Sequence, residues 1–382
     1  MIRLVTLYAD IVLPQTLRKV RTYIMKTKTI LVLILDSLLQ EQKGTASEAA
    51  YTAAYRKMLQ DIQVSQQNHA ITIQAEVLSI QAEVFSTEES DSFCTVISSL
   101  AGRIRDEQEN FDGFLVVVRL SDLVLTAAFL NQMIPEGAKP VVLTSSLRGI
   151  HAPVTDARAN LSDAILYVCA DETRGVTLVF DGKAVAPEHA RLADPESFHA
   201  IESVGHPYPA TIKDGVITRF LPERPAGTPA QFITNLQTSV LSLNWLPGMR
   251  ETDLAGMLSH YSCVILRIQE WSIYAKTSGM EQLHAAIQHL AALCPHTRFI
   301  LFLTESVSRL SSLDRTSSPG RTSFGNSSSS GNDPLSPESD GSWLPLNRET
   351  ILEENAQIMV AQDMTEESVL ALAYLSSAGP TA

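Results

Sequence analysis

Three polar residues stand directly after an apolar run near the middle of the chain. The run is 114–118, and the residues are Arg119, Ser121 and Asp122. A serine hydroxyl can attack a carbonyl group, a carboxylate can accept a proton, and a guanidinium can bind an anion. The same residues could instead begin a helix, with Ser121 as its N-cap and Asp122 in the first turn, where negative charge is favourable. Residue types and spacing leave both interpretations open.

The elements around these residues predict a strand–helix–strand unit. Residues 114–118 are continuously apolar, which is typical of a parallel strand covered on both faces. Apolar residues at helical spacing follow over 123–133, and a second β-branched run lies at 140–144. Ligands of such sheets bind beyond the carboxyl ends of the strands. Ser145 and Ser146, which follow the second run, are therefore further candidates for chemistry.

Length and composition indicate a soluble globular protein with two domains. The chain has 382 residues, of which 45% are hydrophobic and 19% charged, and its net charge is −13. We expect no nucleic-acid partner and no attachment to an anionic membrane surface, because both require clustered Lys and Arg. No run approaches the roughly 18–20 apolar residues that a membrane span needs.

The cysteines lie far apart and show no metal-ligand spacing; they are Cys94, Cys169, Cys263 and Cys294. We therefore expect reduced thiols and a cytoplasmic protein. The sequence also lacks a P-loop, a G-x-G-x-x-G motif and an HExxH motif. No cofactor and no bound metal are expected.

The rest of the chain alternates predicted strands and helices. The predicted strands are 30–35, 71–84, 176–180, 240–246, 263–268 and 298–303. The predicted helices are 41–67, 90–105, 251–258 and 280–293. This alternation is typical of parallel sheets. The turn at Asp181-Gly182 is, by contrast, a hairpin signature.

Composition shifts predict the domain boundaries. We expect an N-terminal arm at 1–27, a larger α/β domain at 28–208, a linker at 209–236 and a smaller α/β domain at 237–382. The arm is either a peripheral segment or a start upstream of Met25. Residues 306–342 are rich in Ser, Gly, Pro and Asn and predict a disordered insert in the second domain.

Several segments together resemble the bacterial L-asparaginases of the asparaginase/glutaminase family. They are DGF at 112–114, TAAFL at 126–130, KPVVLTSS at 139–146, TDARANL at 155–161, NWLPGM at 244–249 and AQDMTEESVLALAYL at 361–375. The resemblance implies a two-domain α/β fold. A larger, mostly parallel sheet flanked by helices would be followed by a smaller C-terminal α/β domain, in a homodimer or homotetramer.

The resemblance also implies hydrolysis of L-asparagine to L-aspartate and ammonia through a threonine nucleophile and a lysine. In this chain Leu38 holds the place of the threonine, and Ser37 is the nearest hydroxyl. Leu192 holds the place of the lysine. Its neighbour Arg191 keeps a cation there, but a guanidinium cannot accept a proton. We therefore expect the activity to be weak or lost.

The resemblance also implies a separate Thr-Asp pair, which acts with the lysine. Its candidate counterpart in this chain lies one residue out of register. Shifting the alignment by one position places Ser121 and Asp122 on that pair. The expected substrate-binding residues are Ser90, Asp91, Arg119 and Arg191.

Two functional hypotheses follow from these assignments. The first is a divergent amidohydrolase that uses Ser121 and Asp122, with Ser37 as a further candidate hydroxyl. The second is an inactive homologue that binds a small amino-acid-like ligand or serves as an assembly partner.

Overall fold

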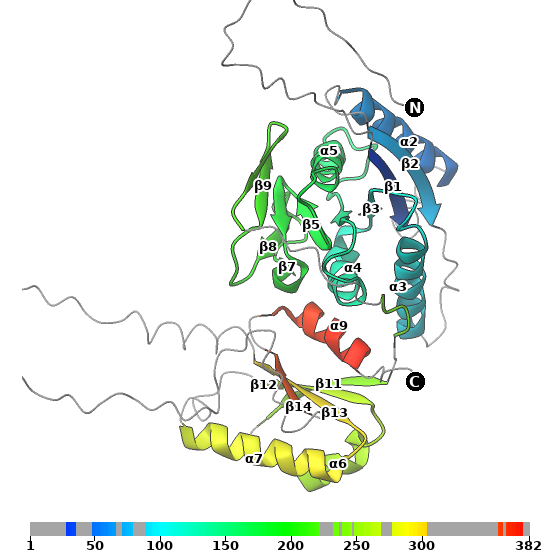
Figure 1. The fold of residues 1–382 in the computed structure, drawn as a ribbon. Coiled ribbons are helices and arrows are strands. Elements are labelled where there is room, and N and C mark those ends of the chain that lie inside the picture. Colours follow the sequence, from blue (N-terminus) through cyan, green and yellow to red (C-terminus); the bar gives the residue numbers. More distant parts are fainter. Residues whose placement is uncertain are drawn as a thin grey trace, which may run out of the picture.

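A computed structural model describes residues 28–35, 48–65, 71–78, 89–221, 232–236, 239–246, 248–268, 277–303, 358–361 and 364–376. In these ranges the chain forms two large sheets with helices packed against them, and a separate two-stranded ribbon (Figure 1). The predicted N-terminal arm, the segment with Ser37 and Leu38, and the Ser-rich insert lie outside the described residues. The predicted domain boundaries stay a prediction.

The larger sheet has eight strands in the order β10-β9-β6-β5-β4-β3-β1-β2. Its parallel part comprises β1 (Lys28–Leu35), β2 (Ile71–Leu78), β3 (Gly113–Val117), β4 (Val141–Thr144) and β5 (Val176–Phe180). The register pairs Ile34 with Val117 and Val117 with Thr144, so these strands end at the same edge. The order 2-1-3-4-5 places the topological switch point between β1 and β3.

The far end of this sheet is antiparallel. It contains β6 (Lys183–Val185), β9 (Ala210–Lys213) and β10 (Val216–Arg219). Asp181 and Gly182 have φ values of 51° and 68° and form the tight turn between β5 and β6, which confirms the predicted hairpin. Asp214 and Gly215 repeat this geometry between β9 and β10.

The hairpin β9–β10 lies inside the segment predicted as a linker, 209–236. Residues 210–219 extend the larger sheet. Ala210 and Ile212 alternate with more exposed residues and pack into the core, as the period of a strand requires. The surrounding residues are rich in Pro and Gly, so this short alternation of buried and exposed residues did not predict a strand.

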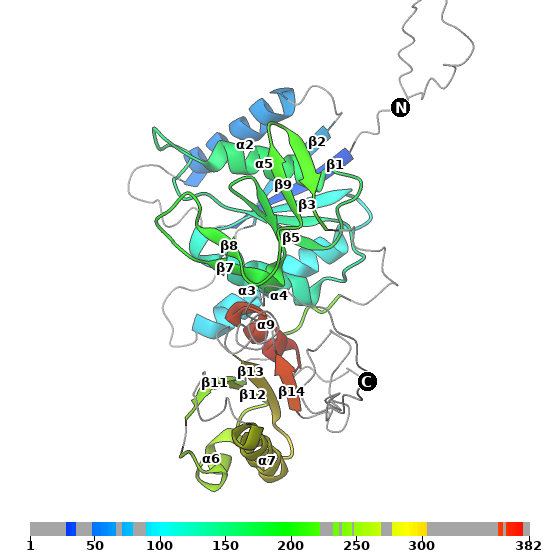
Figure 2. The same ribbon diagram turned by 90° about the vertical axis from the view of Figure 1, so that its left-hand side faces the viewer.

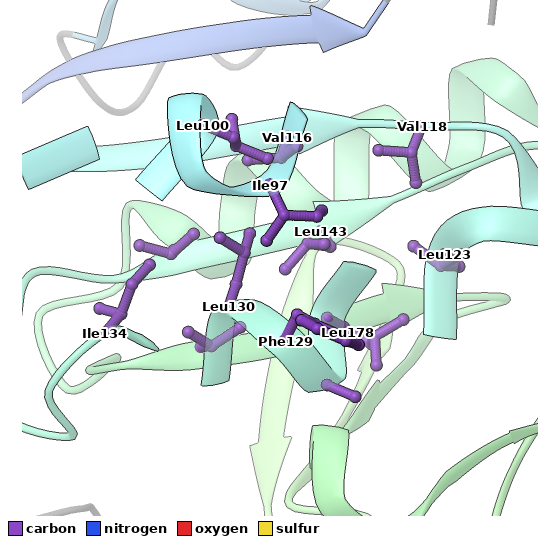
Figure 3. Packing of buried hydrophobic residues seen from close by; sticks show 14 of the residues in the cluster. Ile97, Leu100, Val116, Val118, Leu123, Phe129, Leu130, Ile134, Leu143 and Leu178 are labelled. Carbon is purple, nitrogen blue, oxygen red and sulfur yellow. The ribbon is translucent and has the colours of Figure 1, made fainter. Parts of the chain in front are cut away.

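Helices cover both faces of the larger sheet (Figure 1). One face packs against α2 (Glu48–Ser65) and α5 (Ala157–Val168), and the other against α3 (Glu89–Asp106) and α4 (Leu120–Met133). In β3, alternate side chains enter the two cores, which explains why its sequence is apolar without interruption. Figure 3 shows the α3–α4 core, where Ile97, Leu130 and Val116 pack together.

The smaller sheet is parallel, in the order β11-β12-β13-β14. Its strands are β11 (Val240–Trp245), β12 (Cys263–Ile268), β13 (Arg298–Leu303) and β14 (Ile358–Ala361). The helices α6 (Glu251–Leu258) and α7 (Thr277–Leu293) pack on one face (Figure 2). The structure thus confirms the predicted α/β fold with a larger and a smaller sheet.

Helix α9 (Glu366–Ser376) lies between the two sheets (Figure 2). Ala371 and Leu375 pack into the core that contains α4, whereas Val369 and Ala373 pack against β12 and β13. At its start, α9 contacts the short 3-10 helix η2 (Pro187–His189), where Ser368 Oγ donates a hydrogen bond to Pro187 O (3.1 Å). This helix therefore joins the two halves of the molecule.

Two small strands, β7 (Ala190–Leu192) and β8 (Ile201–Ser203), pair as a separate antiparallel ribbon beside the larger sheet. The loop between them spans residues 193–200. Among the helices of the described ranges, none is long and apolar enough to cross a membrane.

Candidate functional site

The candidate site is the edge of the larger sheet at which β1, β3, β4 and β5 end. Arg119, Ser121 and Asp122 follow β3 there. The helix α4 begins at Leu120, and Arg119 occupies the N-cap position with extended backbone angles (φ −64°, ψ 151°). The expectation that Ser121 caps the helix is therefore wrong, because α4 begins before Ser121. Asp122 does lie in the first turn, as predicted.

These three residues form one hydrogen-bonded group. Ser121 Oγ donates to Asp122 Oδ1 over 3.0 Å, and Arg119 Nε donates to Asp122 Oδ2 over 2.9 Å. Ser121 is exposed, while Arg119 and Asp122 are half-buried. The carboxylate thus accepts hydrogen bonds from a hydroxyl and from a guanidinium at once.

The hydroxyls after β4 have a different role. Thr144 Oγ1 donates to Val179 O and Ser145 Oγ donates to Val118 O, both over 2.8 Å in buried positions. They tie the carboxyl ends of β3, β4 and β5 to one another, so Ser145 is a structural residue. Ser146, the next residue, is half-buried.

Asn160 of α5 connects the loops of this edge. Its Nδ2 donates to Ser145 O and to Asp156 Oδ2, both over 3.0 Å, and its Oδ1 accepts from Asp181 N over 3.1 Å. Asp156 in turn accepts from the backbone N–H groups of Leu147 (2.9 Å) and Arg148 (3.0 Å). The TDARANL segment therefore folds the loop after β4 and fixes the turn after β5.

The remaining predicted residues lie elsewhere. Arg191 is on β7, where its guanidinium is 3.5 Å from the carboxylate of Glu202. Leu192 is half-buried and packs against the α3–α4 core. Ser90 and Asp91 lie at the start of α3, and their side chains fall outside what the structure describes. The structure thus groups Arg119, Ser121 and Asp122, and places Arg191 in a separate ion pair.

A second polar cluster on the same edge was missed by sequence reasoning. Asp181 Oδ2 lies 3.0 Å from Lys183 Nζ and 2.5 Å from His199 Nδ1. Asp163 of α5 is close by, since its carboxylate lies 3.9 Å from where a Cβ on Gly182 would stand. The Asp-Gly turn is a local signal in the sequence. The contact between Asp181 and His199, which lies 18 residues later, has no signal in the sequence.

Asp163 gives this cluster a measurable pH dependence. Burial and the neighbouring charge of Asp181 raise the pKa of the Asp163 carboxyl to about 6. The folded protein therefore holds this proton more tightly than the unfolded chain, and the resulting stability is lost as the pH rises through about 6. Replacing Asp163 by Asn should change stability little at pH 4 and increase it at pH 8.

The two-unit shift corresponds to about 3 kcal/mol before solvent screening, so about 1 kcal/mol is expected for this half-buried group. Urea unfolding midpoints at both pH values measure the effect. Asp106→Asn, at an exposed position, serves as the control. Equal stabilisation at pH 4 and pH 8 would contradict the assignment.

Thiol and metal chemistry find little support among the residues that the structure describes. In this part of the chain no group of three or more His, Cys, Asp or Glu side chains could hold a metal ion. All four cysteines are buried, and none of them forms a disulfide. Burial raises the pKa of the Cys169 thiol to about 11 and that of Cys263 to about 12, so neither forms a reactive thiolate near neutral pH.

Comparison with known proteins shows which proteins this chain resembles. Residues 42–223 match the family model described as Asparaginase, N-terminal. The chain is 28% identical over 159 residues to an L-asparaginase of Thermococcus kodakarensis, which is 41% of this chain and 48% of that protein. It is 27% identical over 164 residues to the 60 kDa lysophospholipase of Mus musculus, 42% of this chain and 29% of that one.

A further relative belongs to the glutamyl-tRNA(Gln) amidotransferase of Thermoplasma acidophilum, with 24% identity over 169 residues, 43% of this chain and 41% of that protein. The matches thus span about half or less of the length of these curated relatives.

Solved structures share the fold. The thermostable L-asparaginase from Thermococcus kodakarensis superposes with a TM-score of 0.55 at 17% identity, over 72% of this chain and 80% of that one. The probable cytoplasmic L-asparaginase from Campylobacter jejuni gives a TM-score of 0.52 at 16% identity, over 74% and 88%.

Proposed function

We propose that this chain is a member of the asparaginase family, because residues 42–223 match its N-terminal model, and that it keeps the family's architecture while hydrolysing L-asparagine slowly or not at all. The observation that carries the proposal is the pairing of Asp122 with Arg119 Nε at 2.9 Å. Attack on an amide requires a hydroxyl and a group that takes its proton. In the carboxylate beside Ser121, Oδ2 is engaged by Arg119 Nε, so only Oδ1 faces the Ser121 hydroxyl.

The place implied for the lysine supports the same proposal. Leu192 packs against the hydrophobic core and has no atom that could accept a proton. Arg191 beside it is engaged with Glu202, and its guanidinium stays protonated. Ser121 therefore remains the candidate nucleophile of a slow amidohydrolase, and Ser37 a further candidate hydroxyl.

The alternative is an inactive homologue that binds a small amino-acid-like ligand at this edge. The intact hydrogen bonds of Asn160 favour it, because they preserve the loops of the edge. In this proposal Arg119 binds the ligand's carboxylate, and Arg191, Ser90 and Asp91 remain candidate contacts. Assembly as a cytoplasmic homodimer or homotetramer is part of the proposal, supported by the family and by the cysteines, which form no disulfide.

Ammonia release from L-asparagine and L-glutamine tests the proposal. Turnover should be lower than that of the Thermococcus kodakarensis L-asparaginase, assayed alongside, by a factor of about 10³ or more. If residual turnover exists, Ser121→Ala and Asp122→Asn should abolish it, while Ser259→Ala, at an exposed serine of the other domain, should not.

Turnover close to that of the reference enzyme would contradict the proposal. Without any turnover, a rise in unfolding temperature with L-aspartate, lost in Arg119→Gln, would favour the binding alternative.

A further inference from the structure

Asp181 and His199 form a hydrogen-bonded pair at the carboxyl end of β5. His199 Nδ1 lies 2.5 Å from Asp181 Oδ2. Asp181 follows β5 directly, in the left-handed turn, and His199 stands near the end of the loop 193–200 between β7 and β8. The His199 side chain is 73% exposed, so most of the ring is in contact with solvent.

A continuous series of hydrogen bonds positions this pair relative to the end of β3. Ser145 Oγ donates to Val118 O, Asn160 Nδ2 donates to Ser145 O, and Asp181 N donates to Asn160 Oδ1. Because β3, β4 and β5 are neighbouring parallel strands, all these groups lie at one edge of the sheet. Asp181 is thereby fixed through its backbone, while its carboxylate is left to orient His199.

We propose that Asp181 and His199 are a proton-transfer pair for the hydrolysis of small carboxylate-bearing esters. Nδ1–H donates a hydrogen bond to Asp181 Oδ2, which holds the tautomer in which Nε2 is a free base. Nε2 takes a proton from a water molecule while the water oxygen forms a bond to the ester carbonyl carbon. The C–O bond to the leaving group then breaks, and the proton passes from Nε2 to the departing oxygen.

Lys183 sets the charge preference of this site. Its Nζ lies 3.0 Å from the same Asp181 oxygen and 5.6 Å from the centre of the Tyr208 ring. An ammonium has three donors, so Nζ can also contact a substrate carboxylate. The pair shares no residue with Ser121 and Asp122, and its activity is independent of asparagine turnover.

Hydrolysis of mono-4-nitrophenyl succinate and of 4-nitrophenyl acetate tests this proposal. His199→Gln should lower the rate about tenfold or more with both esters. Asp181→Asn should also lower it, because Asn tolerates the left-handed turn but lacks the charge that favours the imidazolium. The wild-type rate should fall toward acid pH, as the imidazole takes up a proton. Lys183→Met should raise KM for the succinate ester only.

The exposed His260 of the other domain offers a matched control, and His260→Gln should retain the wild-type rate. The proposal is overturned if His199→Gln stays within twofold of the wild type, or if His260→Gln loses as much. It is also overturned if Asp181→Asn leaves the rate and its pH profile unchanged. Far-UV circular dichroism confirms that each compared variant is folded.

Discussion

Replacing Asn160 by Ala is expected to lower the free energy of unfolding of the N-terminal domain by about 3 kcal/mol. The side chain is 3% exposed and makes three hydrogen bonds, to Ser145 O, Asp156 Oδ2 and Asp181 N. Each bond contributes about 1 kcal/mol, and a buried partner left without a bond costs about 1–3 kcal/mol. Water entering the vacated space would partly replace these bonds, which keeps the expected loss near the lower end.

The tryptophans allow this loss to be assigned to one domain. All three, Trp245, Trp271 and Trp343, belong to the predicted C-terminal domain. In urea, the N160A substitution should shift the unfolding transition seen by far-UV circular dichroism more than that seen by tryptophan fluorescence. Asn110→Ala, which removes an exposed asparagine bonded to Glu107, is the matched control and should cost well under 1 kcal/mol. Equal losses in the two variants would show that Asn160 does not connect the loops as described.

The same residue shows how far the sequence could predict this edge. Apolar runs without alternation predicted the parallel strands correctly, because a strand covered on both faces needs apolar side chains at every position. The two Asp-Gly turns are local signals as well, although only the first was recognised. Two of the three partners of Asn160 lie 15 and 21 residues away in sequence, and no periodicity encodes such distances.

The start of α4 was misjudged for a related reason. Serine is a favoured N-cap, and Ser121 precedes an apolar helical pattern. In the structure, the N–H of Asp122 bonds to the carbonyl of Arg119 (3.1 Å), and the Ser121 hydroxyl bonds to the Asp122 side chain. The ion pair between Arg119 and Asp122 holds this first turn without a side-chain cap. Capping statistics cannot anticipate a competing side-chain pair of this kind.

Helix α9 shows that a sequence pattern does not determine how a helix packs. Most of its residues belong to the 361–375 segment of the family resemblance, and an amphipathic helix usually buries one face. Here Ala371 and Ala373 are both fully buried, toward α4 and toward β12 respectively. Alanines on both sides allow the helix to approach two surfaces closely. The two sheets consequently share one helix, and damage to its contacts with α4 should affect both domains.

Phe129→Ala is expected to be the most damaging single substitution considered for stability, with a loss of about 3–5 kcal/mol. Phe129 is 1% exposed, and its ring packs edge-on against Phe93 of α3 (centroids 5.3 Å apart) and at a tilt against Tyr374 of α9 (5.5 Å). Truncation leaves a cavity where three helices meet, and each aromatic pair adds about 1 kcal/mol beyond its buried area.

Hydrogen exchange should show the consequence directly, because α9 loses its aromatic contact with α4. Amide exchange in 366–376 should accelerate together with that in 120–133, while the outer helix α7 should change least. Phe220→Ala, at a phenylalanine that is 58% exposed, is the matched control and should leave both the urea midpoint and the exchange of α9 close to the wild type. If Phe129→Ala destabilises the protein but α9 keeps its protection, α9 is held by the smaller sheet alone, and the coupling of the two domains through α4 is wrong.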